Sequence, residues 1–178
     1  MPTIMCTTNL WRALGGSGPL PGRLPSDDET TRLGAWSAKS VMYPEGCFVV
    51  GLNERTYLAV AFPFCPLPLF VAVFSAAVGV ELLHLGVPAP AVEAEMIAMR
   101  SDPHFAKNSN RSLLGSLNTL SLDLGWFLED TGRPDAATML ELQHRLTETP
   151  HVNRDPPFAD ESVARLFGGA MTARGRAG

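Results

Sequence analysis

The chain has 178 residues, of which 46% are hydrophobic and 18% are charged, and one well-buried domain is expected at this length. A net charge of −4 argues against a nucleic-acid-binding protein, which would carry a basic surface. The three cysteines lack CxxC spacing, which argues against a disulfide framework and for a reducing, cytoplasmic setting. Residues Met1–Leu10 lack the charged and apolar regions of a signal peptide.

The chain begins with a short apolar strand, predicted over Thr3–Thr7, and a helical turn over Thr8–Leu14. A loop rich in Gly and Pro follows over Gly16–Arg32, with an acidic run at Asp27-Asp28-Glu29. Its few apolar residues cannot repay the entropy lost on ordering, so we expect an exposed and mobile segment.

Three runs rich in β-branched and aromatic residues come next, at Ala35–Tyr43, Gly46–Leu52 and Thr56–Phe62. The turns between them are tight, which predicts an antiparallel meander. The middle run is continuously apolar over Cys47–Val50, so we expect that strand to be buried on both faces.

No charged residue occurs from Thr56 to Val80, and a segment of that length can span a bilayer. Pro63, Pro66 and Pro68 would break such a span in its middle. We therefore predict a buried strand followed by a buried helix over Leu69–Leu85, and no membrane insertion.

Helical patterns dominate the remaining chain, with a short edge strand among them. The strongest helix is predicted over Asn110–Leu128, where a stripe of leucines recurs at helical spacing and Ser109 or Asn110 is the expected N-cap. The other predicted elements are helices over Ala91–Met99, Pro134–Leu146 and Asp160–Phe167, and a strand within Asp102–Lys107.

These elements predict an α+β fold, with a small antiparallel sheet of four to five strands and helices packed mainly on one face. Prolines near residue 150 mark the end of the pattern. We expect a single domain over residues 1–148 and a partly disordered C-terminal extension over residues 149–178.

Three short motifs occur in a fixed order. They are Thr3-Ile4-Met5-Cys6-Thr7, Leu52-Asn53-Glu54-Arg55-Thr56-Tyr57 and Asn110-Arg111-Ser112-Leu113-Leu114-Gly115-Ser116-Leu117-Asn118. In this order they resemble a small bacterial domain family known only as a domain of unknown function. The resemblance covers about Met1 to Leu128; it implies a domain, and no activity.

Several polar residues could bind an anionic group. A helix N-terminus offers free N–H groups, and a neighbouring arginine adds a bidentate donor for phosphate or carboxylate. Helix capping and turn chemistry account for the same side chains without any ligand, and both readings stay open. The candidates are Asn53, Arg55, Lys107, Asn110, Arg111, Ser112 and Asn118.

No catalytic or metal-binding spacing is evident. Cys6 could act as a nucleophile with a histidine as base, although a small buried thiol accounts for it equally. The histidines stand apart in the sequence, so we expect no metal site and no cofactor. The four are His84, His104, His144 and His151.

The function we expect is a non-catalytic interaction module that binds a protein partner or self-associates as a homo-oligomer. The low charge and the high apolar content motivate it. The alternative is an enzyme or ligand-binding domain that acts on a phosphate or nucleic-acid group through Arg111 and its neighbours.

Overall fold

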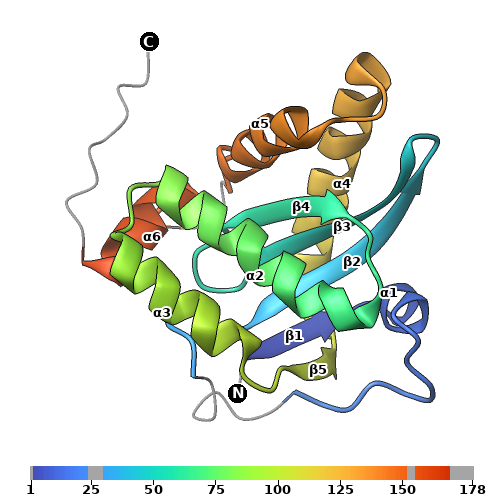
Figure 1. Ribbon diagram of the computed structural model, residues 1–178, viewed down its shortest axis with the longest axis horizontal. Coiled ribbons are helices and arrows are strands. Elements are labelled where there is room, and N and C mark those ends of the chain that lie inside the picture. The colour runs from blue at the N-terminus through green and yellow to red at the C-terminus, as the bar shows by residue number, and fades with distance from the viewer. Residues whose placement is uncertain (1, 24–29, 152–154, 169–178) are drawn as a thin grey trace.

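The computed structural model of the chain describes residues 2–23, 30–151 and 155–168, and it contains one five-stranded sheet with helices on both sides (Figure 1). The spatial order of the strands is β4-β3-β2-β1-β5. The strands are β1 (Thr3–Cys6), β2 (Trp36–Tyr43), β3 (Gly46–Asn53), β4 (Ala59–Pro63) and β5 (His104–Lys107). The helices are α1 (Thr8–Ala13), α2 (Leu67–His84), α3 (Ala89–Arg100), α4 (Arg111–Thr131), α5 (Ala136–Thr147) and α6 (Ala159–Phe167).

The sheet is mixed, which corrects the expectation of a purely antiparallel one. β2, β3 and β4 form the predicted antiparallel meander, but β1 pairs in parallel with both β2 and β5. Parallel neighbours need a long crossover connection, and here α1 and the loop after it supply one such connection. β5 lies at the edge, as expected, yet it pairs with the first strand and not with the one before it in sequence.

Helices cover both faces of the sheet, and the expectation of one covered face is wrong. Alternate residues of a strand point to opposite faces. Ile4 therefore belongs to a core with α2 and α3, whereas Met5 belongs to a core with α4 and α5. The apolar run of β3 contributes to both cores, which confirms that this strand is buried on both faces.

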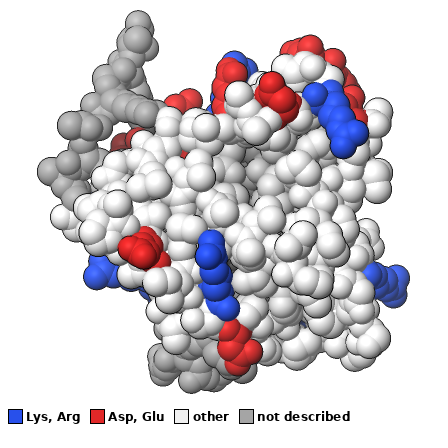
Figure 2. Space-filling model, viewed as in Figure 1, with Lys and Arg blue, Asp and Glu red and all other residues white. Residues whose placement is uncertain are grey.

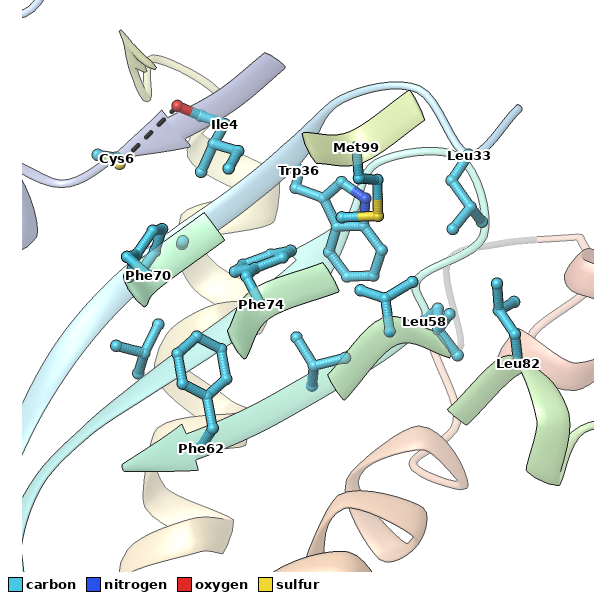
Figure 3. Close-up of a cluster of buried hydrophobic side chains, with 14 of the residues drawn as sticks. Ile4, Cys6, Leu33, Trp36, Leu58, Phe62, Phe70, Phe74, Leu82 and Met99 are labelled. Carbon is cyan, nitrogen blue, oxygen red and sulfur yellow. Dashed lines mark hydrogen bonds between the residues drawn. The ribbon is translucent and has the colours of Figure 1, made fainter. Parts of the chain in front are cut away.

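Aromatic rings fill the centre of the first core (Figure 3). Trp36 of β2 meets Phe74 of α2 edge to face, with ring centroids 5.2 Å apart. Gly51 of β3 makes room for this contact, since a Cβ atom there would lie 3.0 Å from the Phe74 ring and 2.8 Å from Val60. Close packing at this position thus depends on the absent side chain.

α2 has the length and hydropathy of a membrane span, with 39% of the segment buried. One row of its side chains packs into the first core, namely Phe70, Phe74, Val78 and Leu82. These contacts make α2 a helix of the first core.

The second face is covered by the leucine stripe of α4, as predicted. Its buried residues are Leu113, Leu117, Leu120, Leu124 and Leu128. α5 lies along the outer strand β4, where the Thr147 hydroxyl donates to the Ala59 carbonyl at 3.1 Å. The Gln143 amide of the same helix donates to the Ala77 carbonyl of α2 at 3.0 Å. α5 therefore shields the edge strand β4 from pairing with another chain.

The loop before β2 is held by a buried carboxylate. Glu95 of α3 accepts hydrogen bonds from the backbone N–H groups of Arg32 and Leu33, both at 2.9 Å. Burial is the main influence on the pKa of Glu95 and raises it, while these two hydrogen bonds lower it. The acidic run at residues 27–29 lies outside the described residues.

The described part of the C-terminal extension packs on the first core. Val163 of α6 is fully buried there, and the Arg32 guanidinium lies over the Phe167 ring at 5.8 Å from its centroid. Residues 169–178, where disorder was expected, lie outside the described residues.

Candidate functional site

The polar residues at the start of α4 are exposed, and one of them caps the helix. The Asn110 side chain accepts hydrogen bonds from the N–H groups of Ser112 and Leu113 at 3.1 and 3.2 Å, as the sequence predicted for an N-cap. Ser112 and Arg111 extend into solvent. Asn110 therefore serves as the helix N-cap. Arg111 is the exposed cation that a ligand could reach.

Asn118, about two helical turns further on, is paired with a neighbouring strand. Its side-chain oxygen accepts a hydrogen bond from Lys39 Nζ of β2 at 2.9 Å. Burial lowers the pKa of Lys39. Gly115 lies beside open space, since an added Cβ would meet no atom within 4 Å. This glycine therefore does not pack against the sheet.

Asn53 is a buried structural residue. Its amide donates to the carbonyls of Leu33 and Ala35 at 3.0 and 3.2 Å. Its oxygen accepts from the N–H groups of Arg55 and Thr56 and from the Thr56 hydroxyl, at 2.9 to 3.0 Å. With no exposed surface, Asn53 ties the β3–β4 turn to the chain before β2.

The candidate residues do not gather in one place. Arg55, beside Asn53, donates to the Arg32 carbonyl at 3.0 Å. Lys107 ends β5, and two strands stand between β5 and β3. The pairing register sets Lys107 level with Gly51 and not with Asn53, so Lys107 and Asn53 lie more than about 14 Å apart at the usual strand spacing. A joint site that includes both would need a large ligand.

A cavity of about 490 Å³ lies beside Lys107, next to the residues that follow β1. Arg12 and Thr8 of α1 also line it. The Trp11 indole nitrogen, on the same lining, is buried and has no hydrogen-bond partner among the residues that the structure describes. The cavity thus offers two cations, and it opens near the carboxyl ends of parallel strands, where α/β proteins often bind ligands.

Cys6 is a buried thiol and does not have the environment of a nucleophile. Its side chain is 1% exposed, and burial raises its pKa to about 12. All three cysteines are free. The thiolate needed for nucleophilic attack is therefore scarce at neutral pH.

The outer side of α2 carries a continuous row of apolar side chains, which we call the α2 outer stripe. At 100° per residue its members fall within one narrow sector, opposite the row that packs into the core. Leu69, Val80 and Leu83 are 55%, 43% and 52% exposed. The complete stripe is Leu69, Ala72, Ala76, Val80 and Leu83.

The surface over α2 is largely uncharged. Figure 2 shows this side of the molecule, on which charged side chains gather over α3 and toward the edges. A helix exposed to water normally places polar residues on its outer side, and α2 places none there between Leu69 and Leu83.

Two histidines and a carboxylate meet where α2 and α5 end. Glu81 and His84 come from α2 and His144 comes from α5, and their potential ligand atoms all lie within 4.8 Å of one another. The rings of His84 and His144 stack with centroids 3.3 Å apart. The two histidines stand apart in the sequence, as noted, but the fold brings them together beside Glu81.

Comparison with known families identifies the chain. Residues 3–159 match a family described as a domain of unknown function, DUF6933. The chain belongs to this family. The match extends through the start of α6, beyond the end of the resemblance seen in the sequence motifs. Neither a curated protein nor a solved structure matches the chain.

The sequence did not predict the Glu81, His84 and His144 cluster of this DUF6933 domain. Two of its three residues, Glu81 and His84, are nevertheless close together in the sequence. Glu81 is the sole acidic residue of α2, and His84 follows it three positions later, which places both on one side of a helix. His144 lies on another helix, and only the packing of α5 against α2 reveals it.

Proposed function

We propose that this DUF6933 domain is a non-catalytic interaction module and that the α2 outer stripe is its docking surface. The observation that carries the proposal is the row of exposed apolar side chains along a helix without an acidic or basic residue before Glu81. Exposed apolar patches of this kind mark association sites, because burying them in a partner removes them from water.

The occupant that the surface fits best is a second copy of the chain. A charged patch would repel its own copy, whereas an uncharged stripe meets itself without electrostatic cost. Ala72 and Ala76 lie at the middle of the stripe, so two α2 helices can approach closely there. One helix of about 27 Å offers a small contact, and we therefore expect a weak, reversible dimer.

Sedimentation velocity over a range of protein concentrations tests this proposal. The sedimentation coefficient of the wild type should rise with concentration, and Leu69→Glu should abolish the rise because it buries a charge in the contact. Leu122→Glu is the matched control, because Leu122 is 60% exposed but lies on α4. A wild type that stays monomeric throughout refutes self-association, and equal effects of both variants refute the choice of surface.

We further propose that the protein works in the cytoplasm of a bacterium. Its three free cysteines support a reducing compartment. The bacterial origin rests on the family resemblance of the sequence motifs.

A second candidate function is the binding of a small anion in the cavity beside Lys107. The cations Arg12 and Lys107 in the cavity lining support it. Inorganic phosphate should raise the melting temperature of the wild type but not of Lys107→Ala. Arg111→Ala, which removes a cation outside the cavity lining, should keep the shift. If phosphate has no effect on the wild type, this candidate is excluded.

A further inference from the structure

The Glu81, His84 and His144 cluster has the composition and the compactness of a metal site. Three side chains from two helices direct potential ligand atoms to within 4.8 Å of one another. Two imidazole nitrogens with one carboxylate oxygen are ligands that zinc and its first-row neighbours share. This cluster contains no thiolate.

Only one of the two oxygens of the buried Glu81 carboxylate is hydrogen-bonded within the part of the chain that the structure describes. The side chain is fully buried, and Oε2 accepts from His144 Nδ1 at 2.6 Å and from Gln143 Nε2 at 3.2 Å. Oε1 is buried and has no hydrogen-bond partner among the residues that the structure describes. Leaving a buried carboxylate oxygen unpaired is costly, and a bound cation would satisfy it.

The surroundings of the cluster favour a positive charge. α2 ends at His84, and His144 lies in the last turn of α5. The C-terminal end of a helix carries partial negative charge, which attracts cations. Both histidines are partly exposed, so a cation can reach the cluster from solvent.

The distances within the cluster suit a metal after small side-chain movements. Zinc–nitrogen and zinc–oxygen bonds of about 2.0–2.2 Å place neighbouring tetrahedral ligand atoms about 3.3 Å apart. The cluster has one pair of atoms at 2.6 Å and none beyond 4.8 Å. Side-chain rotations that open the parallel stack of the two imidazole rings would complete the geometry, with the fourth position left for water.

We propose that Glu81, His84 and His144 form a binding site for a divalent first-row transition-metal cation, with zinc as the best match. The site goes beyond the proposed docking function and stands independently of it. A bound cation would join the ends of α2 and α5, and binding would add to the stability of the folded chain.

Titration calorimetry with zinc ions on untagged, chelator-stripped protein tests the proposal. The wild type should bind one zinc per chain, and His84→Ala and His144→Ala should each weaken binding at least about tenfold. His104→Ala is the matched control: it removes a histidine outside the cluster and should bind as the wild type does. Circular dichroism of each variant confirms that it is folded.

Cobalt absorption of the wild type gives a second readout that does not depend on any variant. The intense visible bands of tetrahedral cobalt should appear with cobalt alone and disappear when zinc is added. Absence of zinc binding by the wild type would overturn the proposal and leave the cluster as a hydrogen-bonded Glu81–His144 pair. Equal loss of binding in His104→Ala and His84→Ala would overturn the choice of ligands.

Discussion

Replacement of Asn53 with alanine should be among the most destabilising single changes in this domain. The substitution removes five hydrogen bonds at once, two donated and three accepted, from a side chain with no exposed surface. A buried hydrogen bond contributes about 1 kcal/mol net, and groups left unpaired cost more. We expect a loss of about 4 kcal/mol, a large part of the stability typical of a single domain.

Urea unfolding, followed by circular dichroism, measures this loss. At a typical dependence of about 2 kcal/mol per molar urea, the midpoint should fall by roughly 2 M. Asn110→Ala is the matched control, since this asparagine accepts two hydrogen bonds at an exposed helix start and should cost about 1 kcal/mol. If Asn53→Ala lowers the free energy of unfolding by less than Asn110→Ala does, the turn does not depend on Asn53. That result would favour a ligand-binding role for this side chain over a structural one.

Three further changes test the packing and the titration of the core. Gly51→Ala should destabilise the fold by about 1–3 kcal/mol, because its Cβ would collide with buried side chains that cannot move, whereas Gly79→Ala meets only a flexible methionine and should cost less in the same urea assay. Burial raises the pKa of Glu95 from 4.5, so the folded chain holds this proton more tightly than the unfolded chain. Its contribution to stability should therefore fall as pH rises above 4.5, and Glu95→Gln should remove that pH dependence from the unfolding free energy. Cys6, with its pKa near 12, should resist a thiol reagent at pH 8 in the folded protein and react after unfolding, and fast labelling of Cys6 in the native state would contradict its burial.

Local pattern predicted much of the secondary structure. The leucine stripe of α4 is visible because every buried position recurs at helical spacing within one segment. The same segment predicted Ser109 or Asn110 as the N-cap, and the structure has Asn110 in that position. The start of β4 was placed too early, at Thr56, because the backbone from Asn53 to Leu58 forms the turn that Asn53 organises.

Long-range packing escaped prediction. β5 pairs with β1 and not with β4. The residues of a strand do not indicate which other strand it will pair with. α2 and α4 pack on opposite faces of the sheet, and the apolar pattern of each helix is the same whichever face it covers. His144 and Glu81 are 63 residues apart, so their contact depends on the fold alone.

Hydroxyl-radical footprinting at low and high protein concentration tests the proposed docking surface most directly, because it reports the solvent exposure of individual side chains. Self-association through the α2 outer stripe predicts that Leu69, Val80 and Leu83 become protected as concentration rises, while Leu122 and Trp126 of α4, 60% and 64% exposed, keep their oxidation rates. Unchanged oxidation of the α2 outer stripe, or protection confined to α4, would contradict it.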